Sequence, residues 1–175
     1  MMKKTVNGFD YAGHICESMK KGILLTTKAG DQVNTMTIGW GKIGIEWGKP
    51  VFIAYVRESR YTKQMLEANG EFTINVPMEV IDKKILGFCG TKSGRDTDKI
   101  SAMGLTLEEP VAIRVPGIKE FPLTLECKVI YRQKQDLGAI PSDILDKYYP
   151  AAEDGTQDYH WAYYGEILNS YLITE

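Results

Sequence analysis

The stretch GILLTTKAGDQVNTMTIGW, residues 22–40, contains two strand patterns separated by a turn. Residues 22–27 and 33–40 are rich in β-branched and apolar side chains, and Lys28-Ala29-Gly30-Asp31 between them has the composition of a turn. We therefore predict a β-hairpin here. Four more strands are predicted where apolar residues run continuously or alternate, at residues 51–56, 71–76, 123–132 and 161–172.

Helical patterns are shorter and fall between these strands. We predict helices at residues 11–19, from Ser59 onward, at 80–87 and at 141–150. Strands and helices do not alternate regularly, so a parallel sheet built from βαβ units is not favoured. The sequence predicts one domain over residues 1–175, mainly β, forming a barrel or sandwich with peripheral helices.

The composition limits the partners and the compartment. The formal net charge is −2, which argues against a broad surface for nucleic acid or an anionic membrane. No apolar run reaches transmembrane length, and the N-terminal residues lack the apolar core of a signal peptide. Three widely spaced cysteines do not resemble a disulfide framework. We expect a cytoplasmic protein without nucleic-acid or membrane partners.

The helix that follows Ser59 begins with unexpected charges. Ser59 is a good N-cap, but Arg60 and Lys63 stand in the first turn, where the helix dipole favours acidic residues. Cations are favourable there when an anion lies among them. Hydroxyls at Ser59, Tyr61 and Thr62, together with Arg60 and the free helix amides, suit a phosphate group.

The glycine-rich stretch CGTKSGRDTDKI, residues 89–100, suggests a second anion-binding element. Lys92, Ser93 and the amides around Gly90 and Gly94 are able to surround a phosphate. The alternative is a solvated loop in which the basic residues are balanced by the neighbouring aspartates. It is not a P-loop, because Thr91 stands where the motif requires glycine before the lysine.

A second nucleotide-binding motif is also incomplete. Residues 39–44, GWGKIG, match G-x-G-x-x-G, but the dinucleotide fingerprint requires a helix to open at those glycines. Gly48 and Pro50 follow within a few residues and another strand begins. A Rossmann site is therefore rejected.

The strand at residues 34–40 carries an unusual polar residue. Alternation places Asn34 on the same face as Met36, Ile38 and Trp40, and the two threonines on the opposite face. A buried amide needs hydrogen-bond partners. Asn34 suits either the edge of a flat heteroaromatic ring or neighbouring backbone at the strand start.

The usual catalytic groups are not recognisable. His14 and His160 are the only histidines, and neither has cysteines at metal-ligand spacing, so no zinc site is predicted. Cys89 has no adjacent base and is interpreted as a buried thiol. An enzyme with this sequence would depend on a cofactor for its chemistry.

Taken together, these motifs resemble the flavin reductase-like family of FMN-binding split barrels, which includes the flavoredoxins. The resemblance covers most of the chain and rests on KGILLTT (21–27), NTMTIGW (34–40), KPVFIAYVRESRYT (49–62), NVP (75–77), CGTKSGRDTDK (89–99), LECKV (125–129) and HWAYYGE (160–166).

The resemblance implies a homodimer of split β-barrels with FMN near the subunit interface. The isoalloxazine ring would be lined by Asn34, Thr35, Met36 and Thr37, with Trp40 close by. The phosphate would be held by Ser59, Arg60, Tyr61 and Thr62, with Lys92 and Ser93 reaching it from the glycine-rich loop. His160 would lie near the flavin or its substrate.

The implied activity is that of an FMN-dependent oxidoreductase. Electrons would come from NADH, from NADPH or from a small redox-protein partner, and no sequence feature chooses among them. One alternative is an FMN-carrying electron-transfer module with little turnover of its own. Another is a non-enzymatic split barrel that binds haem or a different ligand. Residues 134–159 depart from the family pattern, so no substrate is predicted.

Overall fold

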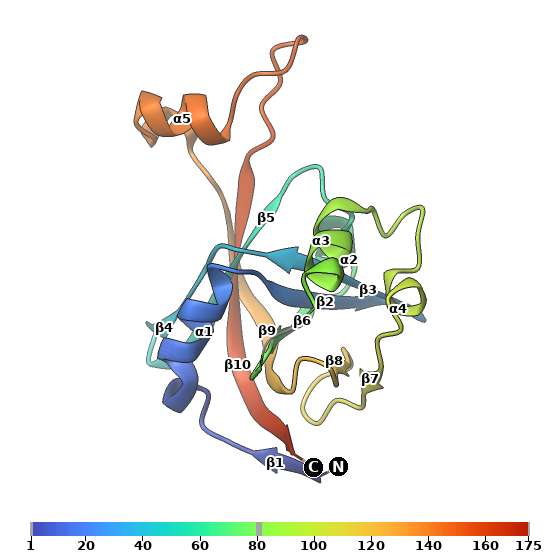
Figure 1. Cartoon of the computed structure of the whole chain (residues 1–175). Helices are drawn as coiled ribbons and strands as arrows, with labels where there is room; N and C mark the ends of the chain where they lie inside the picture. Colours follow the sequence, from blue (N-terminus) through green and yellow to red (C-terminus); the bar gives the residue numbers. More distant parts are fainter. Residues whose placement is uncertain (1, 80–81, 175) are drawn as a thin grey trace.

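The computed structural model describes residues 2–79 and 82–174 (Figure 1). An antiparallel sheet in the order β3-β2-β6-β9-β10-β5-β4, with β1 added on β10, forms the body of the protein. Its strands are β1 (Met2–Thr5), β2 (Ile23–Ala29), β3 (Gln32–Ile38), β4 (Gly41–Glu46), β5 (Lys49–Arg57), β6 (Glu71–Val76), β9 (Leu123–Lys134) and β10 (His160–Thr174). The short strands β7 (Leu107–Glu108) and β8 (Gly117–Ile118) pair separately. The prediction of a mainly β fold with peripheral helices is confirmed.

Short helices lie around this sheet. They are η1 (Gly8–Tyr11), α1 (Ala12–Met19), α2 (Tyr61–Ala68), α3 (Lys83–Thr91), α4 (Lys99–Ala102), η2 (Leu137–Ala139) and α5 (Ser142–Tyr148). The hairpin β2–β3 is contacted by α2, α3 and α4, whereas α1 lies against β4 (Figure 1). Among the described residues, no helix is both long and apolar enough to span a membrane.

Strand β2 has both faces buried, which explains its continuous apolar run. Leu25 joins the main core with Phe52, Phe72 and Tyr163. Its neighbour Leu24 faces the other way, into a smaller cluster. This cluster contains Leu86 and Cys89 of α3 together with Ile118 and Phe121. Burying such a side chain contributes about 1.5–3 kcal/mol. The hairpin is thereby fixed between the barrel interior and the helices that carry the candidate site.

The glycine motif at residues 39–44 forms part of a strand that the sequence analysis missed. Gly41 begins β4, and a Cβ there would lie 2.8 Å from Phe52 Cζ and 3.0 Å from Met19 Sδ. This glycine therefore permits close packing of β4 on α1 and the core. The turn to β5 has positive φ at both Trp47 (52°) and Gly48 (70°), as a two-residue hairpin of type I′ requires.

Two predicted helix boundaries were wrong. Helix α2 begins at Tyr61 with Arg60 as its N-cap, not with Ser59. Ser59 instead donates its hydroxyl to Asp158 at 2.7 Å, and its backbone N–H to the same carboxylate at 3.0 Å. The helix predicted at residues 80–87 runs from Lys83 to Thr91 and is capped by Asp82, while positions 80 and 81 lie outside the described residues. Residues 89–91 are therefore the last turn of a helix and not a loop.

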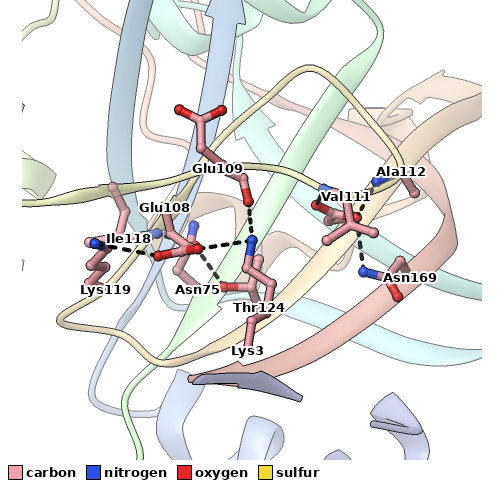
Figure 2. A network of polar contacts seen from close by, with 11 residues as sticks. Lys3, Asn75, Glu108, Glu109, Val111, Ala112, Ile118, Lys119, Thr124 and Asn169 are labelled. Atoms are coloured by element: carbon pink, nitrogen blue, oxygen red, sulfur yellow. Dashed lines mark hydrogen bonds and ion pairs between the residues drawn. The ribbon is translucent and has the colours of Figure 1, made fainter. Parts of the chain in front are cut away.

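A polar network fastens the loop between β7 and β9 to the sheet. Figure 2 shows Glu108 between Lys3 at 2.9 Å and Lys119 at 3.6 Å. Asn75 accepts the backbone N–H of Ile118 at 3.0 Å. The buried carboxylate of Glu126 accepts two backbone N–H groups of this loop at 2.6 and 2.8 Å. Because every member of this network is engaged in holding the loop, we assign it a structural role.

Strands β9 and β10 continue into an arm, residues 135–159, that carries η2 and α5. Figure 1 shows α5 standing away from the sheet. Arg57 at the end of β5 ties the arm down by donating to the carbonyl oxygens of Tyr148, at 3.0 Å, and Asp158. Its guanidinium also lies 5.3 Å from the centre of the Tyr149 ring. This arm falls within residues 134–159, where the sequence analysis expects a departure from the family pattern.

Candidate functional site

A cavity of about 170 Å³ lies where β3 ends beside β5 and β10. It is lined by Met36, Thr37, Ile38, Gly39, Trp40, Tyr55, Arg57, Arg60 and His160. An adjoining hollow of about 470 Å³ shares Gly39, Trp40 and Tyr55 with it. The structure therefore brings five of the predicted site residues to one cavity: Met36, Thr37, Trp40, Arg60 and His160.

The sequence analysis missed Tyr55 and Arg57 at this cavity. Both lie on the half-buried face of β5, opposite the buried Phe52, Ala54 and Val56. This alternation was available in the sequence, but the strand reads as one continuous apolar run. A period of two over its last residues would have placed Tyr55 and Arg57 on one face.

The side chains of β3 are used in three different ways. Met36 and Ile38 are buried and line the cavity. Thr37 donates its hydroxyl to the Leu86 carbonyl at 2.7 Å and so holds α3. Thr35 is fully buried and donates to the Leu25 carbonyl at 3.3 Å. The hydroxyl of Thr35 is thus engaged inside the sheet, and this residue has only its backbone to offer a ligand.

Asn34 is buried between α2 and the glycine-rich loop. Its Nδ2 donates to Thr62 Oγ1 at 3.0 Å, whereas its Oδ1 has no partner among the described residues. Gly94 packs so closely that a Cβ there would lie 2.1 Å from Asn34 Oδ1 and 3.0 Å from Tyr61 Cδ1. An unsatisfied buried acceptor costs about 1–3 kcal/mol. Asn34 is therefore a group for which a hydrogen-bond donor is missing.

The two cations at the start of α2 have different surroundings. Lys63 pairs with Glu58 at 3.1 Å and lies 5.2 Å from the Trp161 ring centre. Arg60 makes no ion pair with any residue that the structure describes, and no acidic residue stands in the first turn of α2. Of the two cations at the start of α2, Arg60 is therefore the one that lacks an ion-pair partner among the described residues.

A further cation, Lys99, is buried within electrostatic reach of Arg60. Only 4% of Lys99 is exposed, and its Nζ donates to the Cys89 carbonyl at 3.0 Å. Burial lowers the pKa of Lys99 to about 8; the Cys89 thiol opposes this shift, and the charge of Arg60 makes a smaller contribution in the same direction as burial. Within the described residues, no carboxylate forms an ion pair with Lys99. A bound anion would stabilise both of these unpaired charges.

The sequence analysis assigned Lys99 only to a balanced, solvated loop. Its neighbour Asp98 does not pair with it, because Asp98 caps α4 by accepting the N–H and hydroxyl of Ser101 at 3.1 and 2.6 Å. No pattern in the sequence signals that this lysine is buried. The burial of Lys99 depends on the fold, in which its Nζ on α4 meets the Cys89 carbonyl near the end of α3.

Lys92 and Ser93 begin the loop that follows α3. Lys92 is exposed, and the Ser93 hydroxyl accepts the backbone N–H of Arg95 at 3.2 Å. Arg95 in turn donates to the Ser59 carbonyl at 3.3 Å and lies 5.3 Å from the centre of the Tyr61 ring. The loop is thus attached to the start of α2, which brings the two predicted phosphate elements together.

His160 and Trp40 form one wall of the cavity. Their ring centroids are 4.9 Å apart, and Tyr148 of α5 meets Trp40 edge to face at 5.2 Å. Trp40 is 41% exposed, whereas His160 is 7% exposed. Burial, assisted by the charges of Arg57 and Arg60, lowers the pKa of His160 to about 4 against an opposing effect of Asp158. The imidazole is therefore neutral at physiological pH.

Two of the three cysteines are buried and unreactive, whereas Cys16 is exposed and lines the adjoining hollow. Cys89 is buried and burial raises the pKa of its thiol, as it does for Cys127. A thiol of raised pKa is a poor nucleophile. Among the described residues, no group of three or more potential metal ligands comes together.

Comparison with known families gives a match over most of the chain. The model of the family described as "Flavin reductase like domain" matches residues 18–174. An uncharacterized protein of Archaeoglobus fulgidus is 32% identical over 100 residues, which are 57% of this chain and 55% of that protein. An uncharacterized protein of Pyrococcus abyssi is 29% identical over 107 residues, or 61% and 59% of the two chains. The chain thus matches little more than half the length of these curated relatives.

Solved structures share the fold. A flavoredoxin of Desulfovibrio vulgaris (Miyazaki F) superposes with a TM-score of 0.66 at 22% identity, covering 87% of this chain and 69% of that one. A flavoredoxin from Methanosarcina acetivorans gives a TM-score of 0.64 at 25% identity, covering 87% and 68%. An FMN-binding domain of a flavin reductases-like enzyme from Shewanella baltica gives 0.63 at 15% identity, covering 98% and 77%.

Proposed function

Since the chain belongs to the flavin reductase-like domain family, we propose that it binds FMN and acts as an oxidoreductase of the flavin reductase or flavoredoxin type. The observation that supports this most is that Arg60 at the start of α2 and the buried Lys99 of α4, which sense each other's charge, form no ion pair with any described residue. A phosphate monoester carries close to two negative charges at neutral pH. It would neutralise both cations.

The remaining features of the site fit a flavin. Asn34 does not line this cavity, but on the same strand its buried Oδ1 lacks a donor among the described residues. Met36, Ile38 and Trp40 give the cavity an apolar wall, which suits a flat aromatic ring. The cavity alone is smaller than a typical cofactor site of about 300–1,000 Å³, so the ring system would extend past Trp40 into the adjoining hollow.

Each part of the chain then has a defined task. Arg60, Lys99 and the free amides of α2 would bind the phosphate, helped by Lys92 and Ser93 from the loop after α3. Strand β3 and Trp40 would hold the ring and exclude water from one side of it. Bound FMN supplies the capacity to accept and pass on hydride or electrons, which none of these side chains has.

The electron donor is proposed by class only. A nicotinamide nucleotide, NADH or NADPH, or a small redox protein would reduce the flavin. Stopped-flow reduction of the FMN-loaded protein by each nucleotide tests this proposal. Rapid reduction by one of them supports a flavin reductase, whereas slow reduction by both supports an electron carrier served by a protein partner.

We also propose a homodimer. Ile45 and Trp47 are 66% and 62% exposed at the β4–β5 hairpin, and Trp47 packs against the half-exposed Tyr131 at 5.9 Å. Large apolar side chains grouped at a surface are typical of an interface. Light scattering at micromolar concentration should give twice the chain mass of 19.7 kDa. A value equal to the chain mass would contradict the dimer without affecting the flavin proposal.

The flavin proposal itself is tested by the visible spectrum and by titration. The protein purified with added FMN should show flavin absorption after gel filtration, and FMN fluorescence should be quenched on binding. A haem spectrum, or a folded protein that does not bind FMN at millimolar concentration, would contradict it.

A further inference from the structure

His160 belongs to a chain of buried polar groups that extends into the arm. Its Nδ1 lies 2.8 Å from the hydroxyl of Tyr149, and the same hydroxyl lies 2.8 Å from Oε1 of Gln135. Tyr149 is 3% exposed and His160 is 7% exposed. Because water is excluded from most of these groups, each proton in their hydrogen bonds has a defined position.

The backbone fixes the orientation of the Gln135 amide. The N–H of His160 points at Gln135 Oε1 at 3.3 Å, while the N–H of Gln135 donates to the His160 carbonyl at 3.0 Å. A backbone N–H can only donate, so the side-chain atom that faces it is the amide oxygen and not the nitrogen. This settles the assignment of the side-chain amide from its partners.

The Tyr149 hydroxyl has a single proton to place. Gln135 Oε1 carries no hydrogen, so the hydroxyl must donate to it. Having donated that proton, the hydroxyl can only accept from the imidazole. Nδ1 of His160 therefore carries a proton.

The other ring nitrogen of His160 is then without one. The imidazole is neutral at physiological pH, since the ring is buried and Arg57 and Arg60 face it, opposed only by Asp158. A neutral imidazole has one N–H, which is at Nδ1 here. Nε2 makes no hydrogen bond to any described residue, and His160 lines the cavity.

We propose that Gln135 and Tyr149 are positioning residues that hold the proton of His160 on Nδ1 and so make Nε2 a hydrogen-bond acceptor in the cavity wall. The cavity then takes a ligand that presents an amide-type N–H at this point. On the proposed function, two sources offer that chemistry: the imide edge of the flavin ring and the carboxamide of a nicotinamide nucleotide. The proton arrangement itself depends on neither.

A second histidine provides an internal reference for a test of the His160 tautomer by NMR. His14, the only other histidine, has its Nε2 2.7 Å from the Pro77 carbonyl. A carbonyl oxygen only accepts, so Nε2 of His14 carries the proton. The two imidazoles are thus expected to be opposite tautomers in one spectrum.

The test is a long-range ¹H–¹⁵N NMR spectrum of the imidazole nitrogens of the full chain without flavin, with a His14→Gln variant to assign the signals. His160 should show the pattern of a neutral ring protonated at Nδ1. Tyr149→Phe removes the acceptor of that proton, and Gln135→Met frees the hydroxyl to donate to Nδ1. Both variants should move the proton to Nε2. Tyr148→Phe is the matched control and should leave the wild-type pattern, because the Tyr148 hydroxyl bonds to no described residue.

A wild-type His160 protonated at Nε2 would overturn the proposal, as would an unchanged tautomer in either folded variant. The ligand class is tested by adding FMN, and then oxidised nicotinamide adenine dinucleotide to the FMN-loaded protein. Upfield movement of the Nε2 signal with FMN identifies the flavin as the donor, and movement only with the dinucleotide identifies the nicotinamide. No movement with either would overturn the ligand class. Failure of FMN to bind by fluorescence would count against the proposed function and leave the tautomer result standing.

Discussion

The charge of Arg60 contributes to the lowered pKa of the buried Lys99, and neither cation pairs with a carboxylate among the described residues. A buried charge without a partner costs several kcal/mol. The protein accommodates it partly through the Cys89 carbonyl, and partly through a pKa near 8 that makes loss of the proton easy. A bound dianion would stabilise such an arrangement, and this is the reason we propose for the unpaired cation at the start of α2.

The first prediction concerns discrimination between FMN and riboflavin, which lacks the phosphate. Charge-assisted hydrogen bonds contribute about 1.5–3 kcal/mol each. Losing two of them should leave riboflavin at least about a hundredfold weaker than FMN, or about 2.7 kcal/mol. Arg60→Ala and Lys99→Met should each weaken FMN by about tenfold or more and leave riboflavin nearly unchanged. Fluorescence titrations at fixed salt measure all these affinities.

Lys92→Ala separates the exposed lysine of the loop from the buried one. We expect a smaller loss of FMN affinity than for Lys99→Met, because an exposed pair is weakened by solvent and salt. Thermal melts of the apoproteins control for folding, and Lys99→Met should be nearly neutral, since removal of a buried charge offsets the lost hydrogen bond to the Cys89 carbonyl. Equal losses for FMN and riboflavin would show that the phosphate lies elsewhere.

The second prediction links FMN binding to protons. The pKa of Lys99 is about 8 in the free protein, and a neighbouring phosphate favours the charged form and raises that pKa. Binding above about pH 8 should therefore take up a proton, and FMN affinity should fall as the pH rises through this range. Calorimetry in two buffers with different ionisation enthalpies measures the uptake. Lys99→Met should abolish it, and an unchanged uptake in this variant would assign the proton to another group.

Much of the fold could be predicted from local patterns. The hairpin of β2 and β3 follows from two strand patterns around a glycine turn, and β6 was located at residues 71–76 as observed. Strand β4 was missed because residues 39–44 were considered only as a nucleotide-binding glycine motif, whereas Gly41 is required by the packing of Phe52 and Met19. The N-cap of α2 was misplaced by one residue because Asp158, far away in sequence, accepts the Ser59 hydroxyl.

The candidate site could be predicted where a residue type is unusual for its position, as with Asn34 and Arg60. The part that could not be predicted depends on long-range contacts. Burial of Lys99 arises from the packing of α4 on α3, and a lysine beside an aspartate normally indicates a solvated pair. The contact of His160 with Tyr149 depends on the path of the arm, for which the sequence offers no periodic pattern.

The third prediction uses two glycines of the same region. Gly94→Ala would place a Cβ 2.1 Å from Asn34 Oδ1, which forces Asn34 and α2 to move. We expect a loss of about 1–3 kcal/mol in unfolding free energy and weaker FMN binding. Gly87→Ala is the control, since a Cβ in this part of α3 would meet nothing within 4 Å. It should stabilise by about 0.5–1 kcal/mol. Urea unfolding measures both, and similar effects of the two substitutions would contradict the packing described for Gly94.

The last prediction follows from the lowered pKa of His160. Its pKa is about 4 in the folded protein and 6.5 in an unperturbed histidine. Between these values the unfolded state binds more protons than the folded state, so acidification favours unfolding. The contribution of His160 to stability is therefore complete above about pH 6.5 and decreases as the pH falls toward about 4.

Carboxylates that titrate near the lower end add to this loss, so the comparison must be made against His160→Gln, which removes only the imidazole. Urea midpoints measured at several pH values should fall more steeply for the wild type than for the variant between about pH 6.5 and pH 4.5. Parallel curves for the two proteins would mean that the imidazole titrates alike in both states, and that it is not enclosed by Tyr149, Trp40 and the two arginines as described.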